Sequence, residues 1–371
     1  MDLSLSKEQL SVRDSVRSFA QRESMRAELQ TLRRSGQLWK PEWYRQFARA
    51  GWTALVIPEE QGGAQLDPTS VVVFMAEMGR HAIPSPLFVS SILSTSILLG
   101  AEQTDVRDAI LGGIAAGEAI VVPAVRRPKT SWKGLLGSPA TLTGAAGSRV
   151  LDAMMVYVPW AADATHFLVS VDAADGATFA LVPADSEGIS VRHLGGFLHA
   201  HYEVVFSDVA VPEDNLIRTA TGTELDDAMS IARVALAAYQ FGGCEEMLDM
   251  SIQHSNTRQQ FGQPIGRFQR VQDHIVRLIN ALDAARWTTY EAAWALENDR
   301  NGAGRSYLAA STASESCLEA ANAAHEVHAG LGSDPDYGLT VYTQASRTLY
   351  ALLGDPKWQR SRMAPTLGWV A

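Results

Sequence analysis

Apolar positions recur at helical spacing in the first third of the chain. Val16 and Phe19 belong to such a series, and Ser6 with Gln9 three residues later has the pattern of a capping box. Further apolar segments of helical length follow, and glycine and proline separate them. The pattern predicts an N-terminal all-helical domain over residues 1–118.

The next hundred residues have a different pattern. Short β-branched and aromatic runs, bounded by Gly, Pro and Asp, replace the long helical series: "AIVVPAV", "RVLDAMMVYVPWA", "THFLVSVD", "TFALVPAD" and "EVVFSDVAVP". Such runs are typical of the strands of a small barrel or sandwich. We therefore expect a middle β domain over residues 119–215.

The helical period returns after that point and continues to the C-terminus. Four long helices are predicted, over residues 225–255, 267–297, 304–328 and 338–353. Long amphipathic helices of this kind pack as an antiparallel four-helix bundle, here over residues 216–371. The order of helical domain, β domain and helical bundle predicts an α+β fold.

Composition limits the possible partners. The chain has 371 residues and a formal net charge of −10, without a basic block, so a nucleic-acid partner is not expected. The N-terminus lacks an apolar signal core, and no apolar run is long enough to span a membrane. Cys244 and Cys317 lie far apart in helical sequence and are expected to be buried apolar residues. These features favour a cytoplasmic protein.

The stretch "RQQFGQPIGRFQRVQ" carries the most specific motif. Arg258, Phe261, Gly262, Ile265 and Gln269 match an R-x-x-F-G-x-x-I-x-x-x-Q pattern. With "GWTALVIPEEQGG", "MGRHAIPSPLF", "VVFSDVAVPEDNLI" and "HEVHAGLGS" in the same order, the chain resembles the acyl-CoA dehydrogenase family over essentially its whole length. The resemblance implies that family's fold and its cofactor, flavin adenine dinucleotide (FAD).

In that family, the residues of this motif serve the flavin of an adjacent subunit. The resemblance gives this role to Arg258, Phe261 and Gln269, while Glu326 and Gly330 would close over the adenosine half. A pyrophosphate suits the fixed fork of donors of an arginine. Glu326 stands where the family usually has glutamine, and a carboxylate near a pyrophosphate is unfavourable unless it binds ribose hydroxyls. The alternative for Arg258 is a solvated cation at a helix end.

The family's reaction needs a carboxylate base for the α-proton of an acyl-CoA. At the two positions where family members carry this glutamate, the present chain has Leu353 and Ala232. Arg233 keeps a family arginine beside the second position and is a candidate substrate residue. Asp355, two residues beyond Leu353, is either a displaced base or a cap of the turn before Pro356. The resemblance therefore assigns no usual catalytic residue.

The stretches that face the flavin in the family also differ here. Val125, Arg126, Arg127 and Pro128 replace a T-E-P stretch whose threonine hydrogen-bonds the flavin ring. Tyr157 stands at the family's tryptophan that packs on the flavin. Its aromatic face can stack in the same way, or Tyr157 is ordinary core of the β domain.

These replacements lead to three hypotheses. The first is a non-base subunit that completes the flavin site of a homologous subunit in an α2β2 acyl-CoA dehydrogenase, similar to actinobacterial enzymes that act on steroid side-chain thioesters. The ending "LLGDPKWQR" also resembles those enzymes. The second is a self-tetramer with a non-standard base or altered flavin chemistry. The third is a member that binds an acyl thioester without redox chemistry.

Two further groups of polar residues have simpler interpretations. His199 and His201 lie two apart on a predicted strand, but no third ligand is evident, so a metal site is not expected. Asp226 and Asp227 are interpreted as carboxylates in the first turn of a helix.

Overall fold

The computed structural model describes residues 4–369 except 133, 136, 146, 174–175, 177, 197–199, 220–222 and 299, and the side chains at 223, 224 and 226 are also outside the description. The chain forms two compact units, each built from separate segments. The first contains Met1–Trp39, Asp67–Pro84 and Arg233–Ala371, and the second contains Lys40–Leu66 and Ser85–Ala232. The N-terminal helices are thus divided between the two units.

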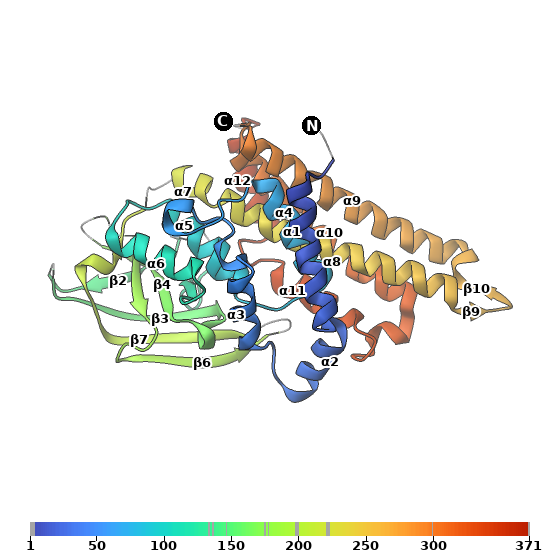
Figure 1. Ribbon diagram of the computed structural model, residues 1–371, viewed down its shortest axis with the longest axis horizontal. Coiled ribbons are helices and arrows are strands. Elements are labelled where there is room, and N and C mark those ends of the chain that lie inside the picture. The colour runs from blue at the N-terminus through green and yellow to red at the C-terminus, as the bar shows by residue number, and fades with distance from the viewer. Residues whose placement is uncertain are drawn as a thin grey trace. The chain divides into compact units, whose positions relative to one another are not determined.

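The first unit is helical (Figure 1). Its N-terminal helices are α1 (Lys7–Arg22), α2 (Met25–Ser35) and α4 (Pro68–Arg80), and α1 packs on α4. The capping box is confirmed: the Ser6 hydroxyl accepts from the Gln9 amide at 3.2 Å, and the Gln9 side chain accepts from the Ser6 amide at 2.9 Å. These bonds satisfy amides that a helix start otherwise leaves unpaired.

The C-terminal helices, from Arg233 onward, form the rest of this unit. They are α8 (Ser230–Thr257), α9 (Gln269–Glu297), α10 (Gly302–His328), α11 (Leu339–Leu349) and α12 (Pro356–Thr366), with short 3-10 turns at Ile265–Arg267 (η6) and Ala329–Ser333 (η7). Three expected helices are shorter than predicted, and one of them, α9, begins at Gln269 instead of residue 267. The first is interrupted at Met229, after α7 (Thr223–Ala228), and the last ends at Leu349 instead of residue 353. Helix α12 was not predicted.

Glycines bring α4 and α8 into backbone contact. A Cβ atom at Gly79 would lie 1.9 Å from the Tyr239 carbonyl oxygen, and one at Gly242 would lie 1.9 Å from that of Ala76. Any side chain at these positions would therefore force the helices apart. Nearby, Cys244 and Cys317 are buried free thiols, as expected.

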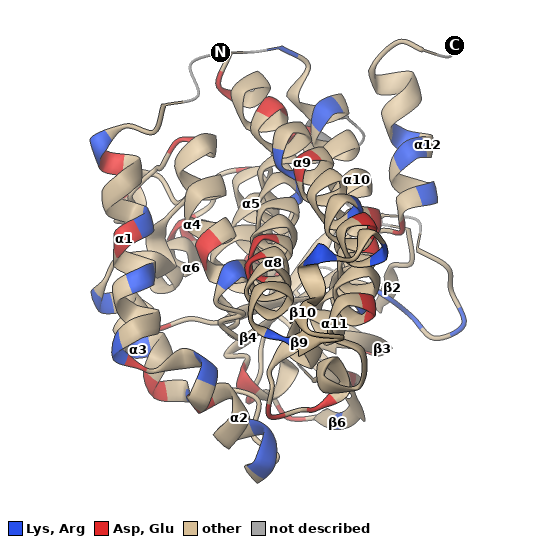
Figure 2. Cartoon of the chain, turned by 90° about the vertical axis from the view of Figure 1, so that its right-hand side faces the viewer, with Lys and Arg blue, Asp and Glu red and all other residues tan. Residues whose placement is uncertain are grey.

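Charged residues of both signs are interspersed on the helices of the first unit, including α1, α9 and α10 (Figure 2). Arg80, at the end of α4, forms ion pairs with three acidic residues of α8: Glu245 at 3.6 Å, Glu246 at 3.5 Å and Asp249. Tyr342 of α11 donates to the Arg80 carbonyl at 2.6 Å. Polar contacts therefore reinforce the close packing of α4 on α8.

The second unit holds a mixed sheet. Its strands are β1 (Val121–Ala124), β2 (Ala140–Thr143), β3 (Arg149–Pro159), β4 (His166–Asp172), β5 (Phe179–Pro183), β6 (Ile189–Gly195), β7 (His201–Val211) and β8 (Leu216–Ile217). The strand order is β6-β7-β3-β2-β4-β5-β8, and β1 pairs in parallel with β4. The five quoted runs form β1, β3, β4, β5 and β7, which confirms the β assignment of the middle block, whereas β2, β6 and β8 were not predicted.

Helices also belong to this unit: α3 (Pro41–Arg49), α5 (Thr95–Leu99) and α6 (Asp105–Ala115), with short turns η1 (Trp52–Ala54) and η2 (Glu59–Gln61). A π-helical segment, η3 (Phe88–Ser94), packs against β1. The buried Ser90 hydroxyl accepts from the Val121 amide at 3.0 Å, and the Ser94 hydroxyl donates to the Val121 carbonyl at 2.9 Å. These bonds satisfy strand groups that would otherwise be buried without partners.

Candidate functional site

The motif stretch forms a small hairpin between α8 and α9 (Figure 1). Strands Gln259–Gln260 (β9) and Gln263–Pro264 (β10) pair in an antiparallel register around a two-residue turn. Both turn residues have positive φ, 51° at Phe261 and 77° at Gly262, which is the geometry of a type I′ hairpin. Glycine adopts it readily, but phenylalanine is unusual there.

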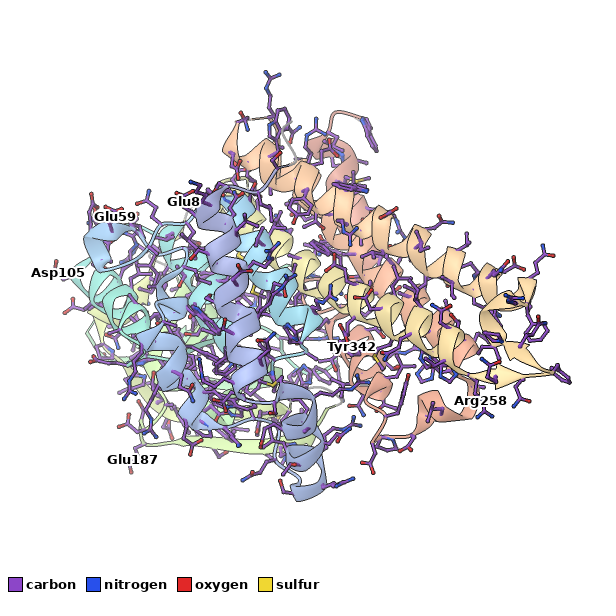
Figure 3. The ribbon with its side chains drawn as sticks, turned by 45° about the vertical axis from the view of Figure 1, so that its right-hand side comes forward. Glu8, Glu59, Asp105, Glu187, Arg258 and Tyr342 are labelled. Carbon is purple, nitrogen blue, oxygen red and sulfur yellow. The ribbon has the colours of Figure 1, made fainter. Side chains whose placement is uncertain are left out.

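The hairpin leaves its characteristic side chains uncovered. Phe261 is 91% exposed, and its ring meets Phe268 edge to face at 6.0 Å. Arg258, at the base of the hairpin (Figure 3), is exposed, and its side chain makes no hydrogen bond or ion pair to any residue that the structure describes. Gln269, the first residue of α9, is exposed as well. A free guanidinium and an uncovered aromatic ring on one short hairpin are available to an anion that also presents a flat surface.

The other two predicted cofactor residues lie at the adjoining end of α10. His328, in the last turn of α10, stacks on His254, in the last turn of α8, with 4.7 Å between ring centroids. Glu326 precedes His328 by two residues and is exposed, and Gly330 follows in the exposed turn η7. We call Arg258, Phe261, Gln269, Glu326 and Gly330 the bundle-end cluster. The sequence motifs, seventy residues apart, thus converge on one end of the helical unit.

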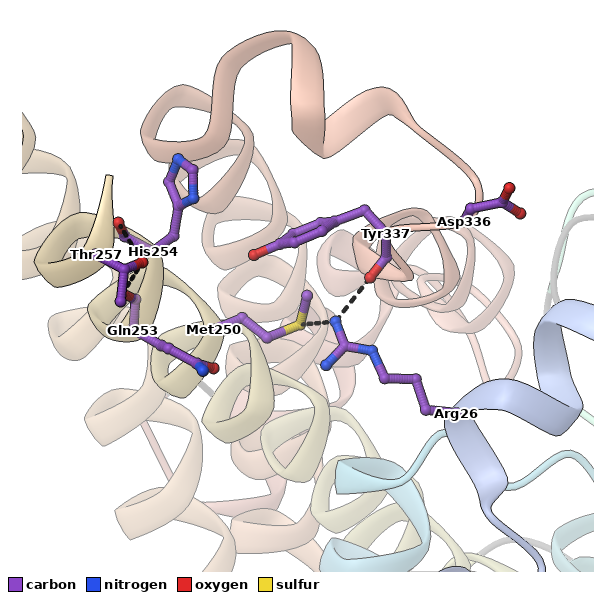
Figure 4. A pocket seen from close by; sticks show the side chains of 7 residues that line it. All are labelled: Arg26, Met250, Gln253, His254, Thr257, Asp336 and Tyr337. Atoms are coloured by element: carbon purple, nitrogen blue, oxygen red, sulfur yellow. Dashed lines mark hydrogen bonds between the residues drawn. The ribbon is translucent and has the colours of Figure 1, made fainter. Parts of the chain in front are cut away.

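A cavity of about 430 Å³ lies beside the last turns of α8 (Figure 4). Its lining comprises Met250, Gln253, His254 and Thr257 of α8, Arg26 of α2, and Asp336 and Tyr337 of the loop before α11. Arg26 donates to the Tyr337 carbonyl at 2.7 Å and approaches the Met250 sulfur at 3.8 Å. Arg34 pairs with Asp336 at 2.6 Å, so polar contacts from α2 hold this loop in place.

The surroundings of the two stacked histidines favour their neutral form. Burial lowers the pKa of His254, and the positive charge of Arg258 lowers it further. Burial is also the main reason that the pKa of His328 is lowered, and the neighbouring His254 acts in the same direction. His328 Nδ1 donates to the Ala324 carbonyl at 2.8 Å, so Nε2 is the unprotonated nitrogen of its neutral ring. Positive charge at this end of the bundle is therefore expected on the arginines.

The two positions at which the sequence resemblance places the family's base are apolar and buried. Ala232 is fully buried in α8, and Leu353 lies 4% exposed in the turn after α11. The Gln359 side chain donates to the Leu353 carbonyl and fixes this turn. Asp355 is the N-cap of α12, where its carboxylate accepts from the Trp358 amide at 2.8 Å, and Pro356 is the first helical residue. Of the two roles considered for Asp355, displaced base or cap, its geometry is that of a cap.

Arg233, the candidate substrate residue, is buried in the helical unit. Its guanidinium donates to the Tyr307 hydroxyl at 2.9 Å and to the Ser306 hydroxyl at 3.3 Å, and it lies over the Tyr307 ring at 3.8 Å. Both partners belong to α10. These contacts give Arg233 a structural role in joining α8 to α10.

In the sheet unit, Tyr157 is 56% exposed, so its interpretation as ordinary β-domain core is wrong. A bulge in β3 turns its side chain outward, and the guanidinium of Arg126 lies over its ring at 4.9 Å. His201 is in β7 and His199 lies outside the described residues, as does the side chain of Asp226.

The sequence did not predict two features of the structure, a cavity and an arginine–tyrosine contact. The cavity beside α8 was one, because Arg26 and Tyr337 belong to segments that are far apart in the chain and carry no motif. The contact of Arg126 with Tyr157 was the other, although the replacement of the T-E-P stretch by "VRRP" was a visible signal. Among the described residues, no group of three or more His, Cys, Asp and Glu side chains is placed to hold a metal ion, and no helix is long and apolar enough to cross a membrane.

Comparison with known proteins gives consistent matches. The acyl-CoA dehydrogenase N-terminal domain matches residues 6–118, and the C-terminal domain of the same family matches residues 225–368. A probable acyl-CoA dehydrogenase of Bacillus subtilis, YngJ, is 24% identical over 99% of this chain and 100% of its own length.

Solved structures agree in fold. The ChsE4-ChsE5 complex from Mycobacterium tuberculosis aligns with a TM-score of 0.89 and 22% identity over 100% of both chains. A variant of the Tcur3481-Tcur3483 steroid ACAD aligns with a TM-score of 0.86 and 24% identity over 99% of both chains. With its helical, sheet and helical parts in the expected order, the chain belongs to the acyl-CoA dehydrogenase family of flavin-dependent oxidoreductases.

Proposed function

We propose that this chain is a non-base subunit of an FAD-dependent acyl-CoA dehydrogenase. In the proposed α2β2 assembly, it lends its bundle-end cluster to a flavin whose ring lies in a homologous partner subunit. One observation carries the proposal: Arg258 is exposed and unengaged within the described chain, whereas Leu353 and Ala232 are apolar and buried. The binding half of a flavin site is retained, and the proton-abstracting half is missing.

The bundle-end cluster suits the phosphate half of FAD. The planar guanidinium of Arg258 offers two parallel donors to a pyrophosphate, and Phe261 presents an exposed apolar ring on the same hairpin. Glu326 carries a negative charge, so its expected partners are ribose hydroxyls and not phosphate oxygens. A flavin held there would supply the acceptor for the hydride from the β-carbon of the acyl thioester.

The α-proton must then go to a residue of the partner. Neither Leu353 nor Ala232 can accept a proton, and Arg233 is occupied by Tyr307 and Ser306. A subunit of this type contributes to binding and to assembly, and the chemistry depends on a second chain with a carboxylate.

A bulky acyl group, such as a steroid side chain attached to coenzyme A, is the proposed substrate. Two structures that share the fold over the whole chain are named as a two-component complex and as a steroid ACAD. The ending "LLGDPKWQR" supports the same subgroup.

The test is to measure the flavin-to-chain ratio of the lone chain and of the chain co-purified with a homologous partner. We expect little flavin in the lone chain and a flavin-loaded complex. Arg258→Ala should lower the flavin content of the complex, while Arg270→Ala, a matched loss of charge at an arginine with a 78% exposed side chain, should not. Full flavin content and turnover by the lone wild-type chain would contradict the proposal.

A self-tetramer with a non-standard base is the competing arrangement. Its candidate base is Asp355, which is exposed but serves as the N-cap of α12. Asparagine caps a helix about as well as aspartate but cannot act as a base. If the lone chain turns over and Asp355→Asn abolishes that turnover without unfolding the protein, the self-tetramer is correct.

A further inference from the structure

The exposed face of Tyr157 is set by an irregularity of the sheet. The register of β3 against β7 shifts between Met155 and Val158, and Tyr157, within this bulge, has a φ of 57°. Val158, the next residue, is buried and pairs with Tyr202. A bulge is a common means of redirecting one side chain out of a strand. Here it places an aromatic ring on the surface of the sheet unit, where a flat ligand could pack on it.

That ring face is already occupied by Arg126. The Cζ atom of Arg126 lies 4.9 Å from the centroid of the Tyr157 ring. The backbone keeps the two residues adjacent, because the Val156 amide donates to the Arg126 carbonyl at 2.8 Å. A planar guanidinium packs on an aromatic face in the same way as a flat ring, so both compete for one surface.

The loop after β1 fixes the arginine in this position. Arg126 Nη2 donates to the Thr130 carbonyl at 3.2 Å, and the Thr130 hydroxyl donates to the Arg127 carbonyl at 2.7 Å. The Arg127 amide in turn donates to the Ser138 hydroxyl at 3.4 Å. Within this closed loop, the arginine cannot swing away from Tyr157 without losing a hydrogen bond.

His201 adds a second contact to the same ring. It approaches Tyr157 edge-on, at 6.4 Å between centroids and an interplanar angle of 75°. Arg126 thus lies over a face of the tyrosine while His201 borders the ring.

We propose that Arg126 excludes a flavin ring from the sheet unit of this chain by occupying the face of Tyr157. This inference rests on the proposed function, in which the flavin ring packs in the partner subunit and not here. It also gives a reason why the flavin ring does not pack in this chain: the side chain of Arg126 covers the aromatic face on which that ring would lie. Arg126 is a positioning residue and takes no part in proton or hydride transfer.

Arg127 provides a matched control. It is the next residue in the chain, carries the same charge and is exposed, but its guanidinium has no stacking contact with an aromatic ring in the part of the chain that the structure describes. Any effect of removing positive charge from the loop will appear equally in both variants. An effect of uncovering Tyr157 will appear only when Arg126 is changed.

The experiment titrates the full chain, purified alone, with FAD and follows quenching of flavin fluorescence. We expect Arg126→Ala to bind FAD at least about five-fold more tightly than wild type, since a cation stacked on an exposed ring must no longer be displaced. Arg127→Ala should behave as wild type. The double variant Arg126→Ala, Tyr157→Ala should lose the gain, because the uncovered ring is then absent.

Three results would overturn the inference: unchanged binding by Arg126→Ala, an equal gain by Arg127→Ala, or a gain that survives removal of Tyr157. Arg126→Met, which keeps the aliphatic stem, serves the same test if Arg126→Ala fails to fold by circular dichroism. Failure of the proposed function has a different signature. In that case the wild-type chain alone would already hold one flavin per chain, whatever residue stands at position 126.

Discussion

Arg258 and Arg126 belong to different compact units and differ in what surrounds them. Arg258 lies at the base of a hairpin, exposed and without a described partner, while Arg126 is stacked on Tyr157 and tied to Thr130. A free guanidinium retains its donors for a phosphate. A stacked guanidinium instead covers an aromatic face of its own chain that a ligand could otherwise contact. In the proposed function, the same residue type therefore favours flavin binding in one region and opposes it in the other.

Arg233 extends the comparison to a buried arginine and gives the largest expected effect. Arg233→Ala should lower the free energy of unfolding by about 3 kcal/mol, because it leaves a cavity and removes the hydrogen bonds from Arg233 to the buried hydroxyls of Tyr307 and Ser306. Urea denaturation measures this loss. Arg233→Met keeps most of the side-chain volume and should therefore be less destabilised than Arg233→Ala. Equal losses of unfolding free energy in both variants would argue against the cavity contribution.

Arg258→Ala should instead weaken FAD binding and leave the stability of the lone chain nearly unchanged. We expect the affinity of the two-subunit complex for FAD to fall about 10- to 100-fold, as for loss of charge-assisted hydrogen bonds to a phosphate. The free energy of unfolding of the lone chain should change by less than about 0.5 kcal/mol, because the side chain is exposed. A large loss of stability together with unchanged flavin affinity would place Arg258 among the structural arginines.

Phe261 offers a further test of whether the hairpin is built for binding or for stability. Asparagine tolerates positive φ and precedes Gly262 in the favoured Asn-Gly turn, so Phe261→Asn should stabilise the lone chain by roughly 0.5 kcal/mol. The same variant should weaken the complex, because it removes a 91% exposed aromatic ring. Differential scanning calorimetry of the lone chain and flavin retention by the complex give the two readouts. A destabilised lone chain would contradict this account.

The histidine pair gives the smallest expected effect and reports on the charge of Arg258. Because the positive charge of Arg258 lowers the pKa of His254, Arg258→Ala should move that pKa upward, which an NMR titration of the imidazole detects. An unchanged or lowered pKa would mean that the guanidinium lies too far away to act.

Acidification should destabilise the helical unit through the same pair. The pKa of His328 is lowered in the folded state, so its contribution to stability is fully present above the unfolded pKa of about 6.5 and is lost as the pH falls through the folded value. His328→Phe keeps a ring on His254 but cannot titrate. It should therefore flatten the dependence of unfolding free energy on pH below about 6.5; a slope equal to wild type would exclude His328 as its source.

The sequence predicted the kinds of elements better than their ends. The Ser6–Gln9 capping box and the strands with β-branched runs were visible because their signals are local. Strand β6 was missed because its residues are mostly exposed on both faces and lack the alternation that marks a half-buried strand. The break at Met229 and the early end of α11 at Leu349 were missed because helical periodicity continues through both points.

Along the chain alone, the motif around Arg258 predicted a flavin-binding half, and the apolar residues Leu353 and Ala232 predicted that the base is missing. Residue identity decides that question, since leucine and alanine cannot carry a proton in any fold. Only the tertiary structure decided which arginine is free. Whether a guanidinium is exposed, stacked on Tyr157 or buried against Tyr307 depends on contacts between segments far apart in sequence. No local pattern encodes such contacts, because folding sets the distance between those segments.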